Sequence, residues 1–140
     1  MTKRCNKRGK RKYRKNILKT LTFTGFNPNG VKSKLTTIRK LIRETRSAVV
    51  TMQETKCSQA GQFNFDGYFT YEQIRPKTEG GGVSVSALKN RQPVFVSDGG
   101  ETVEALSIDI HSKDMTISVS SAYGPKKVLF VKRKTHFGTT

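Results

Sequence analysis

Four short clusters of polar and glycine residues lie at the ends of predicted strands, where they could form one functional site. In open sheets that contain parallel strands, sites gather where strand ends meet loops, because a rigid strand holds a side chain against a cleft. The four clusters are Asn27-Pro28-Asn29-Gly30, Gln53-Glu54-Thr55-Lys56, Glu79-Gly80-Gly81-Gly82-Val83 and Ala122-Tyr123-Gly124-Pro125.

Glu54 is the residue in these clusters with the clearest chemical use. It follows the apolar run Ala48–Met52, so its carboxylate is expected at the rim of the core. A carboxylate there needs a partner, and a hard cation such as Mg²⁺ is the partner that would give it a function. A strand-end carboxylate can equally pair with Lys56 or cap a backbone turn, and the residues alone leave these alternatives open.

The other clusters also have plain structural explanations. Asn29-Gly30 is favourable turn chemistry, and the glycines at 80–82 suit a flexible hairpin connection. The glycine triplet matches neither a P-loop nor a dinucleotide-binding fingerprint. Tyr123 before Gly-Pro is typical of an aromatic ring packed at a turn, and neither histidine stands near a nucleophile. Taken singly, the clusters define no activity.

A strand, a helix and a second strand precede and position the first two clusters. The alternating segment 17–26 predicts a strand that ends at the turn 27–30. Ser33 is the predicted N-cap of a helix that stops near 45–47, with apolar residues 35, 38, 41 and 42 on one face. The run 48–52 predicts a strand covered on both faces. This βαβ order makes the two strands parallel neighbours.

Later segments predict antiparallel strands. Strands are expected over 68–71, 83–88, 102–110 and 115–121, and the last two form a hairpin around the turn 111–114. The predicted fold class is therefore α/β (α+β), with one mixed sheet in which a βαβ unit is followed by antiparallel strands, and with a helix on one face.

The charge of the chain is concentrated at its two ends. The 140 residues carry a formal charge of +17, and residues 1–43 hold 15 Lys and Arg and no acid. Such a dense basic run repels itself until a polyanion neutralises it. We expect an arm over 1–16 that binds nucleic acid or acts as a nuclear-import signal; a solvated tail is the alternative. The arm's candidate nucleic-acid contacts are Lys7, Arg8, Lys10, Arg11, Lys12, Arg14 and Lys15.

Composition excludes several classes of protein. Two cysteines, Cys5 and Cys57, cannot make a multi-bridge disulfide framework, and two histidines exclude a histidine-rich zinc module. No apolar run approaches the ~20 residues of a membrane-spanning helix. An intracellular, nuclear protein with reduced cysteines and no membrane partner is expected.

Taken together and in order, the four clusters resemble the first half of the endonuclease/exonuclease/phosphatase (DNase I-like) superfamily. The shared pattern is a strand ending in N-x-N-G, a helix, a strand ending in QETK, a glycine triplet entering a strand, and a strand ending in YGP. The sequence is most similar to the apurinic-type endonuclease domains of non-LTR (LINE-type) retrotransposons. That likeness rests on MQETK at 52–56, GGGV at 80–83, DGGE at 98–101 and SAYGP at 121–125.

The resemblance implies a four-layer αββα sandwich that cleaves a phosphodiester of DNA with a divalent metal, Mg²⁺ or Mn²⁺. By position, Glu54 would be the metal ligand and Asn29 a second metal-associated group. Asn27 would help to orient the site, and Tyr123 would donate its hydroxyl to an oxygen of the scissile phosphate. A metal and neutral donors stabilise the negative charge that builds up on the phosphorus centre while a base activates water.

The sequence departs from the family's pattern at two places. Phe26 stands where members usually have tryptophan or another bulky group, and Pro28 separates the two asparagines. After Pro125 the family continues with Gly-Asp-x-Asn, a further aspartate and an Asp-His pair, whereas this chain continues with KKVLFVKRKTHFGTT. We therefore expect that the chain does not build the second sheet or half of the catalytic groups. His136 is not assigned as the missing base.

The predicted organisation is a basic arm over 1–16, the N-terminal half of the domain over 17–125 and a divergent basic tail over 126–140, typical of a truncated or frame-shifted end. The predicted function is a truncated, metal-dependent phosphodiesterase or endonuclease domain of retrotransposon type acting on DNA, with RNA as another possible partner of the arm. The alternative is a small basic nucleic-acid-binding protein without catalysis. Metal binding at Glu54 separates the two, and the oligomeric state is left open.

Overall fold

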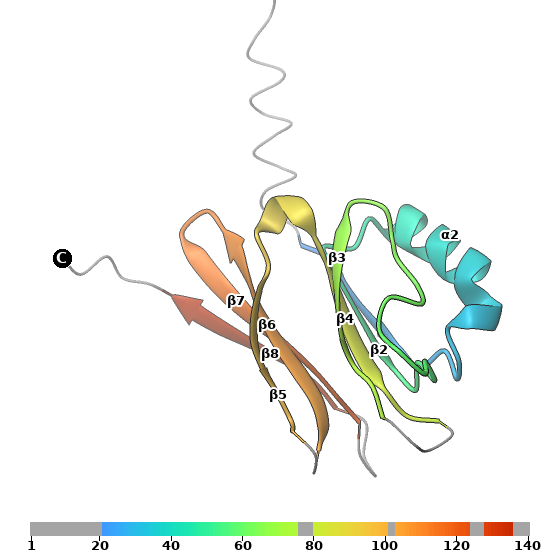
Figure 1. Cartoon of the computed structure of the whole chain (residues 1–140). Coiled ribbons are helices and arrows are strands. Elements are labelled where there is room, and N and C mark those ends of the chain that lie inside the picture. The colour runs from blue at the N-terminus through green and yellow to red at the C-terminus, as the bar shows by residue number, and fades with distance from the viewer. Residues whose placement is uncertain (1–20, 76–79, 101–102, 124–127, 136–140) are drawn as a thin grey trace, which may run out of the picture.

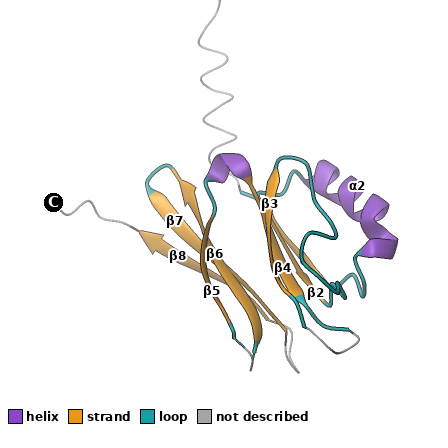
Figure 2. Ribbon diagram, viewed as in Figure 1, coloured by secondary structure: helices purple, strands orange, loops and turns teal. Residues whose placement is uncertain are grey.

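Two four-stranded sheets stack face to face, and one helix covers the outer face of the first (Figures 1 and 2). The computed structural model describes residues 21–75, 80–100, 103–123 and 128–135. Sheet A has the strand order β1-β2-β4-β3, and sheet B has the order β5-β6-β7-β8. The predicted α+β class is confirmed. None of the helices in these ranges is long and apolar enough to cross a membrane.

Sheet A contains the predicted βαβ unit. Strands β1 (Phe23–Phe26) and β2 (Val49–Gln53) are parallel, with Phe26 opposite Met52. β2 is also antiparallel to β4 (Val83–Leu88), and β4 is antiparallel to β3 (Tyr68–Gln73). Every residue of β2 is buried, as a strand covered on both faces requires.

Helix α2 (Leu35–Thr45) crosses between β1 and β2 and turns Ile38 and Ile42 into the core. It ends at Arg46, which adopts the left-handed conformation (φ 49°) and donates its backbone N–H to the Ile42 carbonyl at 2.9 Å. A left-handed residue at this position satisfies a carbonyl that the helix would otherwise leave unpaired.

The predicted N-cap at Ser33 is wrong. Ser33 lies inside a short 3-10 turn, η1 (Lys32–Lys34), and Lys34 occupies the N-cap position without a side-chain cap. The Lys34 backbone N–H donates to the Val31 carbonyl at 3.0 Å, so a 3-10 turn leads into the helix in place of a serine cap.

Sheet B is antiparallel throughout. Strands β6 (Glu104–Ser112) and β7 (Met115–Tyr123) form the predicted hairpin. β5 (Val94–Asp98), which follows the 3-10 turn η2 (Lys89–Arg91), pairs with β6, and β8 (Val128–Thr135) pairs with β7.

The expectation that this chain cannot form a second sheet is therefore wrong. The antiparallel strands divide between sheets A and B, and residues 128–135 of the segment assigned to a tail form β8. The physical reason is the alternation of β6, whose residues Leu106, Ile108 and Ile110 form an apolar face. That face is buried by packing against sheet A and could not be buried within the plane of one sheet.

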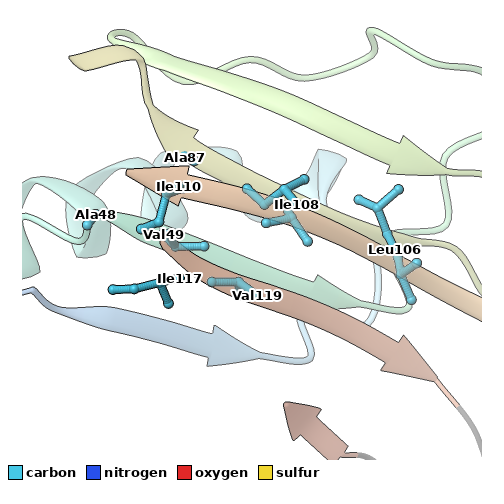
Figure 3. Close-up of a cluster of buried hydrophobic side chains, with 10 residues drawn as sticks. Ala48, Val49, Ala87, Leu106, Ile108, Ile110, Ile117 and Val119 are labelled. Carbon is cyan, nitrogen blue, oxygen red and sulfur yellow. The ribbon is translucent and has the colours of Figure 1, made fainter. Parts of the chain in front are cut away.

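The main core lies between the two sheets. Figure 3 shows its side chains converging from β2 and β4 on one side and from β6 and β7 on the other. A second core lies between sheet A and α2 and contains Val50, Met52, Ile38 and Ile42. Sheet A is thus packed on both faces, and this packing fixes the strand ends from which the loops begin. The labelled residues of the main core are Ala48, Val49, Ala87, Leu106, Ile108, Ile110, Ile117 and Val119.

Candidate active site at the strand ends

Backbone hydrogen bonds join three of the four predicted clusters into one rim. The N–H of Gly30 donates to the carbonyl of Glu54 at 2.9 Å, and the N–H of Val31 donates to that of Thr55 at 3.0 Å. From the other side, the N–H of Thr55 donates to Gly82 at 3.2 Å and that of Lys56 to Gly81 at 2.9 Å. The loop after β2 therefore lies between the loop after β1 and the loop before β4.

The loop after β2 has an uncommon backbone conformation. Glu54 and Lys56 both lie in the left-handed region, with φ values of 52° and 54°. Non-glycine residues occupy this region at some energetic cost, and such residues cluster at functional sites. Thr55, between them, is buried, whereas Glu54 is half-buried and Lys56 is exposed. A Cβ on Gly82 would lie 2.5 Å from Thr55 Oγ1, so the loop requires glycine there.

Buried polar contacts bring the fourth cluster, on sheet B, against this rim. Gln53 Nε2 donates to Ser121 Oγ at 3.1 Å, and Ser121 Oγ donates to the Met52 carbonyl at 3.4 Å. Ser121 lies two residues before Tyr123 on the same face of β7, so these bonds fix the approach of Tyr123 to the loop after β2. The structure thus brings the described residues of all four clusters to one edge of the sandwich.

The hydroxyl of Tyr123 meets the carboxylate of Glu54. A hydrogen bond from the Tyr123 hydroxyl to Glu54, reinforced by the negative charge of that carboxylate, raises the pKa of Tyr123 above its usual value. Tyr123 therefore stays protonated at neutral pH and remains a hydrogen-bond donor. The structure thus brings Tyr123 and Glu54 together, and their roles as phosphate donor and metal ligand stay predictions.

Arg75 and Glu104 complete the cluster, and sequence reasoning missed both. Arg75 follows the end of β3 and donates from Nε to Glu104 Oε1 at the start of β6. The Arg75 Cζ lies 5.8 Å from the centroid of the Tyr123 ring. Both residues lie at strand ends, and this position could have marked them as candidate site residues. Arg75 was missed because the predicted strand 68–71 ended two residues before the observed β3 does.

Asn27 and Asn29 form the turn after β1. The backbone N–H of Asn29 donates to Asn27 Oδ1 at 2.9 Å, and Asn29 is left-handed with φ 49°. Asn29 is exposed and directly precedes Gly30, whose N–H bonds to Glu54. The backbone thus brings Asn29 close to Glu54. Their roles at a metal stay predictions.

The donors present suit a hard cation held mostly by water. Among the described ranges, no three His, Cys, Asp or Glu residues gather closely enough to enclose a metal. Glu54 supplies a half-buried carboxylate, and Oε2 of Glu104 is buried without a hydrogen-bond partner in this part of the chain. The carboxylate of Glu104 is already paired with Arg75. Glu54 is therefore the carboxylate of this cluster that would hold Mg²⁺ or Mn²⁺, with water filling the rest of the shell.

His111 lies far from this site, at the opposite end of the β6–β7 hairpin, where its Nδ1 is 3.2 Å from Thr116 Oγ1. His111 is therefore too far from the site to be the base that activates water. His136, Glu79, Gly124, Pro125 and the arm over 1–16 fall outside the described residues. The predicted nucleic-acid contacts that fall outside with the arm are Lys7, Arg8, Lys10, Arg11, Lys12, Arg14 and Lys15.

Solved structures of AP endonucleases are similar to this chain. An AP endonuclease from Archaeoglobus fulgidus matches with a TM-score of 0.57 and 21% identity, over 76% of this chain and 42% of that one. The AP endonuclease LMAP from Leishmania major matches with a TM-score of 0.58 and 17% identity, over 72% and 39%. No family model matches the sequence, and no curated protein does so. The likeness shows a DNase I-like fold, and the chain spans about two fifths of each neighbour's length.

Proposed function

We propose that this chain is part of a metal-dependent phosphodiesterase domain, of the retrotransposon endonuclease type, that acts on DNA. The observation that carries the proposal is the convergence of Glu54 and Tyr123, from different sheets, on one rim of hydrogen-bonded loops. The fold shared with AP endonucleases supports the class of reaction. The motifs MQETK, GGGV, DGGE and SAYGP favour the retrotransposon type.

Each residue has a defined task in this proposal. Glu54 holds the divalent cation through its carboxylate, and Asn29 lies beside it. The cation supplies charge neutralisation for a phosphate oxygen. With Glu54 on the cation, the Tyr123 hydroxyl turns its single proton from Glu54 to another phosphate oxygen. The turn formed by Asn27 fixes the position of Asn29.

We further propose that the basic arm over 1–16 contacts the DNA backbone and directs the protein to the nucleus. Ten of the first 19 residues are Lys or Arg. Charges of this density neutralise phosphates without reading sequence. The arm would then supply affinity while the strand-end site supplies chemistry, and RNA could bind the same arm.

The metal proposal is tested by titrating Mg²⁺ into isotopically labelled protein and recording amide chemical shifts. Weak, saturable shifts are expected around Gly30, Thr55 and Tyr123, because one carboxylate leaves most of the octahedral shell to water. Glu54→Gln should abolish these shifts. Glu44→Gln, which removes an exposed carboxylate on helix α2, should leave them intact.

Equal shifts in wild type and Glu54→Gln would contradict the proposal and favour a basic nucleic-acid-binding protein without a metal site. The variant also carries an internal check. Removing the Glu54 charge should lower the pKa of Tyr123, because that carboxylate is the main reason for its elevation. A lowered Tyr123 pKa confirms that the variant has lost the contact.

A further inference from the structure

Arg75 is placed beside Tyr123 by an ion pair that crosses between the two sheets. Its Nε donates to Glu104 Oε1, and its Cζ lies 5.8 Å from the centroid of the Tyr123 ring. The side chain of Glu104 is 14% exposed, whereas that of Arg75 is 37% exposed. The carboxylate is thus the less exposed partner of the pair, and the guanidinium is the more exposed one.

Gly81 creates the space for this ion pair. A Cβ on Gly81 would lie 2.5 Å from Cζ and Nε of Arg75 and 2.7 Å from Oε1 of Glu104. Gly81 also has a φ of +73° and accepts the backbone hydrogen bond of Lys56 through its carbonyl. Gly81 therefore contacts both the loop that carries Glu54 and the ion pair of Arg75 with Glu104.

An arginine guanidinium can pair with a carboxylate and with an anion at the same time. Its bond to Glu104 uses one of the five N–H donors of an arginine. The planar group can therefore pair with Glu104 on one side and present further donors to a phosphate on another, a geometry that phosphate matches well. Because Arg75 lies over the Tyr123 ring, its guanidinium is close to the side chain proposed to donate to the phosphate.

We propose that Arg75 binds the same phosphate that Tyr123 contacts, and that Glu104 and Gly81 are its positioning residues. The inference rests on the proposed phosphodiester site and adds to it a substrate-binding cation. The arrangement also divides the work at the site. Glu54 would hold the cation on the side of sheet A, and Arg75, paired with Glu104 of β6, contacts the phosphate from the side of Tyr123.

The test is binding of a thymidine dinucleotide, which carries one phosphodiester and is too short to span the site and the arm together. Wild type should show saturable amide shifts at Tyr123 and Gly81 in the NMR titration. Arg75→Gln should weaken binding about tenfold or more, the usual range for a lost charge-assisted hydrogen bond. Arg43→Gln, at an exposed arginine on helix α2, should bind as wild type does.

Two further readouts separate phosphate binding from a structural ion pair. Arg75→Lys keeps the charge but not the planar fork, so it should restore only part of the affinity. Unchanged thermal unfolding would show that the fold has survived. If Arg75→Gln does not fold, the comparison of Arg75→Lys with wild type decides.

The proposal is overturned if folded Arg75→Gln or Arg75→Lys binds the dinucleotide as tightly as wild type, if wild type shows no saturable binding, or if Arg43→Gln loses as much affinity. This result is independent of the metal titration. Loss of dinucleotide binding in Arg75→Gln together with no effect of Glu54→Gln on Mg²⁺ would retain the phosphate site and reject the metal.

Discussion

The 140-residue chain, purified to homogeneity and incubated with Mg²⁺, is expected to leave supercoiled plasmid DNA uncut. Hydrolysis at this site needs a base to activate water in addition to a metal and a phosphate donor. The sequence contains no Gly-Asp-x-Asn segment and no Asp-His pair. His111 lies at the far end of sheet B from Tyr123. General acid–base groups contribute about 10²–10⁴-fold, so nicking should be at least ~100-fold slower than by a complete enzyme of this fold.

A complete AP endonuclease acting on plasmid with abasic sites provides the positive control for the nicking assay. Glu54→Gln provides the negative control, because it removes the proposed metal ligand while keeping the shape of the side chain. Nicking by the wild-type chain that disappears in Glu54→Gln would contradict the prediction. It would mean that another group in this chain, or a second copy of it, activates the water.

Ile108→Ala is expected to lower the free energy of unfolding by about 2–5 kcal/mol. Ile108 is fully buried between the sheets, opposite Val119 on β7 and packed against sheet A (Figure 3). The truncation removes buried methyl groups and leaves a cavity that two rigid sheets cannot close. Urea unfolding followed by circular dichroism measures the change.

Val94→Ala is the matched control for this truncation, because it removes methyl groups from a side chain that is 52% exposed on β5. A loss well below 1 kcal/mol is expected there. If Ile108→Ala were as mild as Val94→Ala, the packing of sheet B on sheet A would not be the main core. The approach of Tyr123 to Glu54 would then lack its support.

The hydrophobic pattern of the sequence was sufficient to predict the strands that pack against a core. β4 was predicted at its observed bounds, and the parallel pairing of β1 with β2 followed from the βαβ order. β5 was missed because all five of its residues are exposed, so it shows no alternation of buried and exposed positions. β8 was missed because its basic residues resemble those of an unstructured tail. The pairing of β8 with β7 is a tertiary contact that its composition does not reveal.

The candidate site shows the same limit. Strand ends located Glu54, Tyr123 and the glycine triplet, because the rule that sites form there depends only on where strands stop. The ion pair of Arg75 with Glu104 depends on how sheet A lies over sheet B, and the two residues are 29 positions apart. Gln53 and Ser121, which are 68 positions apart, form a hydrogen bond that depends on the same packing. Such contacts require the stacking of the sheets, which no local pattern specifies.

Paramagnetic broadening by Mn²⁺ tests most directly the claim that the four clusters form one metal site. Substoichiometric Mn²⁺ added to labelled protein should first broaden the amide signals of Gly30, Thr55, Gly81 and Tyr123, which come from three loops at the end of sheet A and from the end of β7 in sheet B. Signals at the opposite end of the β6–β7 hairpin, around His111, should stay sharp. Broadening centred on another cluster of acids, or spread evenly over the chain, would contradict the account.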